Sequence, residues 1–149
     1  MRTAEEILNE KETAIVFVSP EVTVHDALAV MVEKKIGAIL VKEHDEFVGI
    51  YTERDLLQDS VYADFNPWEA KLRNHMATNL LTAPQDAPLY QLQDTILGKR
   101  IRHILIVKEG KTIGVLSAGD IMKAHMNDIS QQLKSVGWDY YENWRWKKK

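Results

Sequence analysis

The sequence contains no cysteine, so it forms no disulfide bond and offers no thiolate to a metal ion. A chain without cysteine is compatible with a reducing compartment. No apolar run approaches the roughly 20 residues that a helix needs to cross a bilayer. The segment from Met1 to Glu12 is rich in glutamate, and it lacks the basic start and apolar core of a secretory signal. These absences predict a cytoplasmic protein.

An excess of positive charge is also missing. The chain has 19 Lys and Arg against 22 Asp and Glu, a net charge of −3, which argues against nucleic acid as the main partner. The familiar glycine-rich nucleotide loops and the His-Glu-x-x-His zinc motif are absent, and the five histidines lack metal-ligand spacing. We therefore expect no enzyme, no metal site and no resident cofactor. With 149 residues, 45% of them hydrophobic, the chain is long enough for one compact unit.

What the sequence does contain is an internal repeat. Gly49-Ile-Tyr-Thr-Glu-Arg-Asp55 and Gly114-Val-Leu-Ser-Ala-Gly-Asp120 share glycine, two apolar residues, a hydroxyl residue and an aspartate at one constant offset of 65. The similarity extends over about residues 18–60 and 82–125. Two copies are too few for a solenoid, so we expect a pseudo-symmetric pair around one core. The predicted segments are a lead-in helix and strand (1–17), repeat 1 (18–65), a linker and second lead-in (66–81), repeat 2 (82–125), and a C-terminal helix with a tail (126–149).

Each repeat is predicted to fold as helix, strand, strand, helix, which gives an α/β (α+β) protein. In repeat 1, Thr23 caps a helix, and His44-Asp45-Glu46 is a turn between two strands. In repeat 2, the first helix begins at 86–88 and ends near Gly98. A capping box at Thr3 to Glu6 predicts the lead-in helix, and residues 70–76 look like its counterpart before repeat 2.

The repeated motif has two interpretations that the residues alone leave open. Thr52-x-x-Asp55 and Ser117-x-x-Asp120 are plausible helix caps, and the glycines Gly49 and Gly114 could allow another backbone to approach closely. Alternatively, a hydroxyl at a helix N-terminus could bind phosphate, an aspartate could accept from a ribose, and glycine would leave room for a base. Arg54 would add charge beside a phosphate. In repeat 2 its place is taken by Gly119, so a second cation must come from elsewhere, and the candidates are Lys99, Arg100, Arg102 and His103.

Five segments, three in the first copy and two in the second, closely resemble a pair of cystathionine-β-synthase (CBS) domains, also called a Bateman module. They are residues 18–28, 37–41, 49–55, 102–106 and 114–120. The resemblance implies a regulatory module that binds an adenosine-containing ligand, namely AMP, ADP, ATP or S-adenosylmethionine, in the cleft between the copies. Two residues depart from the pattern: Leu105 stands where the family often has proline, and Gly119 stands opposite Arg54.

The resemblance also implies site residues. It places Asp55 and Asp120 on ribose, Thr52 and Ser117 at phosphate, and Arg54 nearby. Arg102 and His103 would face the cleft, and the base would be lined by Val18, Ser19, Leu81 and Thr82. Because Arg54 has no counterpart, repeat 1 is the better candidate for holding phosphate.

The final helix carries apolar residues with heptad-like spacing, at Met122, Met126, Ile129, Leu133 and Val136. This helix could pack on its own domain or pair across a homodimer, and the resemblance favours the homodimer. The tail from Trp138 to Lys149 combines aromatic and basic residues. We favour its docking onto the module over its use as an anchor for an unidentified protein, a membrane or nucleic acid. The alternative function is a ligand-free interaction module acting through this tail.

Overall fold

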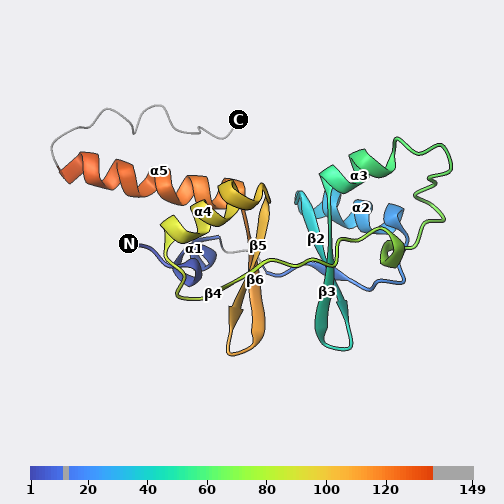
Figure 1. The fold of residues 1–149 in the computed structure, drawn as a ribbon, viewed down its shortest axis with the longest axis horizontal. Coiled ribbons are helices and arrows are strands. Elements are labelled where there is room, and N and C mark those ends of the chain that lie inside the picture. Colours follow the sequence, from blue (N-terminus) through green and yellow to red (C-terminus); the bar gives the residue numbers. More distant parts are fainter. Residues whose placement is uncertain (12–13, 136–149) are drawn as a thin grey trace.

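The computed structural model describes residues 1–11 and 14–135 and consists of two similar halves (Figure 1). The first half contains β1 (Phe17–Val18), α2 (Val24–Lys34), β2 (Ala38–Glu43), β3 (Glu46–Thr52) and α3 (Glu53–Asp59). The second contains β4 (Thr82–Pro84), α4 (Leu89–Lys99), β5 (His103–Lys108), β6 (Lys111–Ser117) and α5 (Ala118–Ser135). Helix α1 (Ala4–Glu10) and a 3-10 helix, η1 (Leu72–Asn74), precede the halves. The predicted α/β fold of two pseudo-symmetric repeats is confirmed. The expectation of one core is wrong, because each half has a buried core of its own and the two halves share only a smaller third cluster.

Each half has a three-stranded sheet, in the orders β1-β2-β3 and β4-β5-β6. The first strand runs parallel to the second, and the second and third form an antiparallel hairpin. The register repeats with the sequence, because Val41 lies opposite Gly49 and Ile106 lies opposite Gly114. The predicted order of helix, strand, strand and helix is therefore present in both halves, with a short parallel strand before it.

Local sequence signals account for most element boundaries. Thr3 forms a capping box with Glu6, and the Thr23 side chain accepts from the Asp26 amide. His44 adopts a left-handed φ of 48° in the turn between β2 and β3. Helix α4 ends at Lys99, one residue past the Gly98 near which its end was predicted, so the glycine is the penultimate helical residue and not the cap. The left-handed cap residue is Arg100, with φ 52°.

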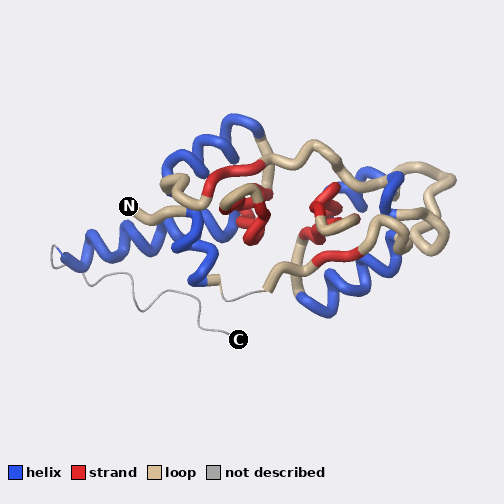
Figure 2. The backbone as a smooth tube through the Cα atoms, turned by 90° about the horizontal axis from the view of Figure 1, so that it is seen from below, coloured by secondary structure: helices blue, strands red, loops and turns tan. Residues whose placement is uncertain are grey.

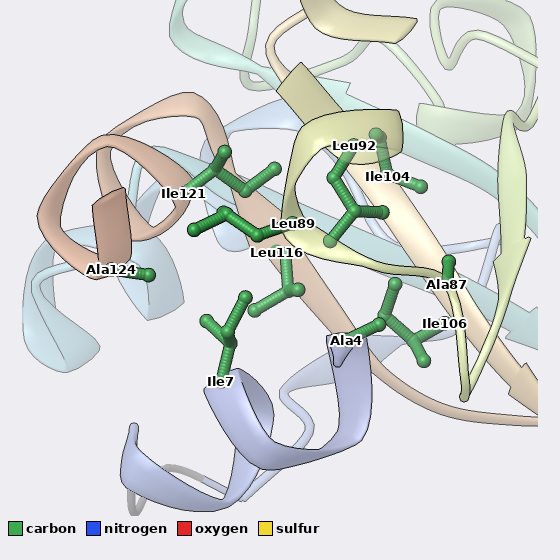
Figure 3. Packing of buried hydrophobic residues seen from close by; sticks show 10 residues of the cluster. All are labelled: Ala4, Ile7, Ala87, Leu89, Leu92, Ile104, Ile106, Leu116, Ile121 and Ala124. Atoms are coloured by element: carbon green, nitrogen blue, oxygen red, sulfur yellow. The ribbon is translucent and has the colours of Figure 1, made fainter. Parts of the chain in front are cut away.

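Helix α1 packs on the second half, although the first half follows it in the chain (Figure 1). The Ala4 amide donates to the Ala87 carbonyl at 2.8 Å. Figure 3 shows Ala4 and Ile7 of α1 among the core residues of the second half, including Leu89 and Leu116. The lead-in helix of repeat 1 thus completes the core of repeat 2.

Residues 70–77 make the reciprocal exchange with the first half. Leu72 is fully buried in the core of that half, and its amide donates to the Val22 carbonyl at 2.9 Å. Ala77 exchanges two backbone hydrogen bonds with Ile50 of β3, at 2.8 and 2.9 Å. Each half is therefore completed by the segment that leads into the other half.

The two repeated glycines accommodate these exchanged segments. A Cβ atom added at Gly114 would lie 2.6 Å from both methyl carbons of Leu8, and one added at Gly49 would collide with Met76 and lie 3.2 Å from the Ala77 carbonyl oxygen. The space above both glycines is filled by the protein itself and is not left open for a base. This agrees with the interpretation of these glycines as sites of close approach.

The two sheets lie in the middle of the molecule, and most of the helices lie outside them (Figure 2). Leu40, Ile50 and Leu105 form a buried cluster of their own, to which residues of both halves contribute. Ile15 and Leu80 pack against this cluster. Leu40 and Leu105 are counterparts under the repeat offset, as are Ile15 and Leu80, so the contact follows the pseudo-symmetry of the repeat.

Helix α5 packs on its own half through Ile121 and Ala124, which are both buried in the second core. Met122, on another face, is 59% exposed. Val136 and the tail from Trp138 lie outside the described residues, so the predictions made for them stay predictions. Within the described ranges, the helices are too short or too polar for a membrane span.

We expect Gly114→Ala to destabilise the protein by about 1–3 kcal/mol, because the new methyl group overlaps Leu8 and the core must shift. The free energy of unfolding in urea measures the effect. In a Leu8→Ala background the same substitution should cost much less, since the space above residue 114 is then open. Equal costs in the two backgrounds would show that Leu8 is not the group in contact.

Candidate functional site

The start of helix α3 combines a helix cap with a free carboxylate oxygen. Thr52 is the cap residue, and its amide and hydroxyl both donate to Oδ2 of Asp55, at 2.9 and 3.0 Å. The Asp55 amide donates back to the Thr52 hydroxyl at 3.3 Å. The capping interpretation of this motif is therefore correct. Because both bonds use Oδ2, the other carboxylate oxygen, Oδ1, remains available to accept from a ligand.

The start of α5 repeats this geometry with one addition. The Ser117 amide donates to Oδ2 of Asp120 at 2.8 Å, and the Asp120 amide donates to the Ser117 hydroxyl at 3.1 Å. Lys11, which follows α1, places its ammonium 2.8 Å from the same Oδ2. Burial raises the pKa of Asp120, but the bonds from Lys11 and Ser117 outweigh burial and lower the pKa overall.

Thr52 and Asp55 line a cavity of about 170 Å³ between the two halves. The first half contributes the end of β3 and the start of α3. The second half contributes the turn between α4 and β5, and the segment before β4 closes another side. The lining residues are Ile50, Thr52, Arg54, Asp55, Ala77, Asn79, Leu80, Leu81, Arg100, Ile101, Arg102, His103 and Leu105.

Three arginines give this cavity its charge. Arg54, Arg100 and Arg102 are all exposed. Within residues 1–11 and 14–135, none of the three makes an ion pair or a side-chain hydrogen bond. Arg102 is fixed through its backbone, since its carbonyl accepts from the Ala118 amide at 2.8 Å. An anion at the rim of the cavity can therefore bind these guanidinium groups without first breaking an existing contact.

His103 also lines the cavity and is partly buried. Burial lowers its pKa, and the positive charge of Lys11 lowers it further. Asp120 opposes this with a smaller effect than that of Lys11, and Arg102 (lowering) and Glu53 (raising) contribute less. The imidazole of His103 therefore stays neutral at a lower pH than the imidazole of a free histidine does.

The structure brings together seven of the residues that the sequence analysis named: Thr52, Arg54, Asp55, Leu81, Arg100, Arg102 and His103. The others do not line this cavity. Val18 packs on the first core, Ser19 and Thr82 are exposed after β1 and in β4, and Ser117 and Asp120 lie at the start of α5. Gly49 and Gly114 lie under Met76 and Leu8.

Sequence reasoning missed Asn79 and Leu80 as lining residues, and it missed Lys11 as a partner of Asp120.

The backbone also corrects the predicted counterpart of Leu81. The Leu81 carbonyl accepts a hydrogen bond from the Leu105 amide, and the Val16 carbonyl accepts from the Leu40 amide at the equivalent place in the first repeat. Val16, and not Val18, is therefore the counterpart of Leu81. The repeat offset, if carried through the lead-in segments, would have identified this pair.

A larger hollow, of about 560 Å³, lies at the other end of α3 and is a poorer candidate for an anion. Its charged lining residues are Asp59, Asp64 and Glu69, with His75 beside them and no lysine or arginine. His75 is already paired with Asp59 at 3.2 Å. The described residues also contain no group of three acidic or histidine side chains placed to hold a metal ion.

Comparison with known proteins agrees with this architecture. The profile of the CBS domain matches residues 4–61 and 72–127. The mitochondrial CBS-domain-containing protein CBSX3 of Arabidopsis thaliana is 28% identical over 119 residues, which make up 76% of this chain and 58% of that protein. The chain thus spans little more than half the length of curated relatives that it matches.

Two solved structures show the same fold. A CBS-domain-containing protein from Agrobacterium tumefaciens is 28% identical, with a TM-score of 0.78 over 83% of this chain and 99% of that one. CBSX2, solved in complex with AMP, is 25% identical, with a TM-score of 0.66 over 76% of this chain and 89% of that one. The duplicated sequence, the paired sheets and the profile match lead to one conclusion: this chain belongs to the CBS-domain family and contains two CBS domains.

Proposed function

We propose that this protein is a regulatory module that binds an adenine nucleotide in the cavity beside Thr52 and Asp55. The observation that carries the proposal is the set of three arginines, Arg54, Arg100 and Arg102, which lack ion-pair partners in the described structure and surround one cavity. Unpaired guanidinium groups from two separate repeats form a binding site for phosphate. The complex of the related CBSX2 with AMP supports the adenosine part of the ligand.

The cavity is large enough to bury only part of a nucleotide, and the rest of the ligand stays exposed. A volume of about 170 Å³ is smaller than the roughly 300–1,000 Å³ of a typical ligand pocket. The nucleoside therefore enters only in part, and the phosphate lies at the rim among the arginines. Oδ1 of Asp55 accepts from a ribose hydroxyl, and the apolar side chains of Leu80 and Ile101 contact the base.

We expect AMP to bind with its phosphate at the arginines, so Arg102→Ala should weaken binding about tenfold through loss of a charge-assisted hydrogen bond. Asp55→Asn should also weaken binding by removing a charged acceptor. Isothermal titration measures both effects, and adenosine should bind more weakly than AMP. At about 100 times its dissociation constant, AMP should add about 2.7 kcal/mol to the free energy of unfolding.

Lys111→Ala is the matched control, because Lys111 is an exposed cation in the β5–β6 hairpin, outside the cavity. It should leave AMP affinity unchanged. Equal losses in Lys111→Ala and Arg102→Ala would indicate general electrostatic attraction. If AMP, ADP, ATP and S-adenosylmethionine all fail to bind, the proposed function is wrong.

A bound phosphate should raise the pKa of His103, because a nearby negative charge favours the imidazolium. The free protein holds the pKa of His103 below its ordinary value, mainly by burial. A group with a higher pKa in the complex takes up a proton on binding, so AMP affinity should increase as pH falls from about 7.5 to about 6. Titration of His103 by NMR, with and without AMP, measures the shift. His103→Gln should lose the part of the pH dependence that phosphate ionisation does not cause.

For the output of the module we propose contact with a second copy of the chain. Val32 and Leu57 of the first half are 78% and 69% exposed, and Leu97 and Met122 of the second are 75% and 59% exposed. Val32 corresponds to Leu97 under the repeat offset, and Leu57 corresponds to Met122, so the halves present equivalent apolar positions on their helices. A homodimer would cover both, and the cavity between the halves would be coupled to that interface. A further protein partner, acting through the tail, stays an alternative.

We expect Leu97→Glu to shift the protein from dimer to monomer, because a charge would be buried at the interface. Light scattering after gel filtration, at matched concentrations, measures the mass. Trp68→Glu is the control, since Trp68 is 66% exposed but lies in the linker between the repeats. A monomeric wild-type protein, or loss of the dimer in both variants, would rule out this interface.

A further inference from the structure

The end of α1 reaches into the region of the second repeat that corresponds to the nucleotide cavity. Lys11 donates to Oδ2 of Asp120 at 2.8 Å and to the Val115 carbonyl at 3.2 Å. Its side chain is 27% exposed and that of Asp120 is 25% exposed, so the pair is partly shielded from water. A pair of this kind is worth more than one on the open surface.

The first repeat has no such cation at the corresponding position. Leu8 and Met76 are counterparts, because each lies above one of the two repeated glycines. Lys11 follows Leu8 by the same number of positions as Asn79 follows Met76. Asn79 lines the first cavity and is neutral. The carboxylate of the first repeat, Asp55, therefore has no cationic partner among the described residues.

We propose that Lys11 closes the second cleft to tight binding. Its ammonium neutralises Asp120 through Oδ2 and belongs to the position that the neutral Asn79 occupies at the first cavity, so a ligand must compete with the ammonium for this carboxylate. This inference rests on the proposed nucleotide function and adds a regulator to it. The wild-type protein binds one nucleotide tightly, at Thr52 and Asp55. Its second cleft is occupied by the protein's own lysine.

The position of Lys11 connects this closure to the rest of α1. The helix is also held on the second half by Glu5, whose carboxylate lies 2.6 Å from Lys108, and by Leu8 against Gly114. A ligand at Asp120 and the docked end of α1 therefore compete for the same carboxylate. A ligand that draws Asp120 away from Lys11 weakens the docking of the helix, and weaker docking of the helix must favour that ligand by the same factor.

The lysine also acts on the first cavity. Among the charges near His103, Lys11 has the largest effect after burial, and it disfavours the imidazolium. Departure of Lys11 removes this repulsion and exposes the negative charge of Asp120. Both changes raise the pKa of His103 and make its surroundings more favourable to protonation. The two clefts are thus electrostatically coupled through one side chain.

The test is AMP titration of the full-length chain, comparing wild type with Lys11→Met, which keeps the length of the side chain and removes its charge. Wild type should bind one AMP tightly. Lys11→Met should bind a second AMP at least about tenfold more tightly than wild type does, since a charge-assisted hydrogen bond no longer competes. Adding Asp120→Asn to Lys11→Met should remove this second binding event and leave the first.

Lys108→Met is the control, because it breaks another ion pair between α1 and the second half without touching Asp120. It should keep the stoichiometry of wild type. NMR titration without ligand gives an independent readout, in which the pKa of His103 rises in Lys11→Met and stays in Lys108→Met.

The outcomes separate the two proposals. Two equal sites in wild type, or identical isotherms for wild type and Lys11→Met, overturn the closure by Lys11 while nucleotide binding stands. An unchanged His103 pKa in Lys11→Met overturns the coupling between the clefts. If no variant binds AMP although the His103 pKa shifts, the nucleotide function fails, and the gating of the second cleft fails with it.

Discussion

The small apolar contact between the two sheets determines how the residues of the candidate nucleotide cavity come together. Leu40, Ile50 and Leu105 are buried there although they come from different repeats. Each repeat alone would leave this face of its sheet in water, so burial of the face requires the second copy. Because the contact follows the pseudo-twofold relation, it brings the end of β3 opposite the turn before β5. That approach places Asp55 and Arg102 on the same cavity.

The exchange of lead-in segments strengthens this pairing and also breaks its symmetry. Ala4 and Ile7 complete the second core, and Leu72 completes the first. Neither half can separate without exposing these side chains. The two segments are not copies of each other, however, since α1 is a capped helix of seven residues and η1 is a single 3-10 turn. The sheets are therefore nearly equivalent, while the surroundings of Asp55 and Asp120 differ.

The sequence was sufficient to predict the features that occur in both repeats at the constant offset of 65 residues. The order of the strands, the two helix caps and the equivalence of Thr52 in repeat 1 with Ser117 in repeat 2 all follow from that offset. Three features were not predicted. Gly98 lies inside α4, and the end of this helix is set by the left-handed Arg100. The contacts of Leu8 with Gly114 and of Lys11 with Asp120 join residues that are far apart in the sequence. Such contacts depend on which half a segment packs against, and no local pattern records this.

The motif also shows why capping and binding are compatible explanations of the same residues. Thr52 uses Oδ2 of Asp55 to fix the first turn of α3, which leaves Oδ1 with no partner among the described residues. A carboxylate held in this way has lost its rotational freedom before a ligand arrives, so binding costs less entropy. Asp120 is held just as firmly by Ser117. The difference between the clefts therefore comes from the neighbouring cation, which is Lys11 beside Asp120 and has no equivalent beside Asp55 in the described part of the chain.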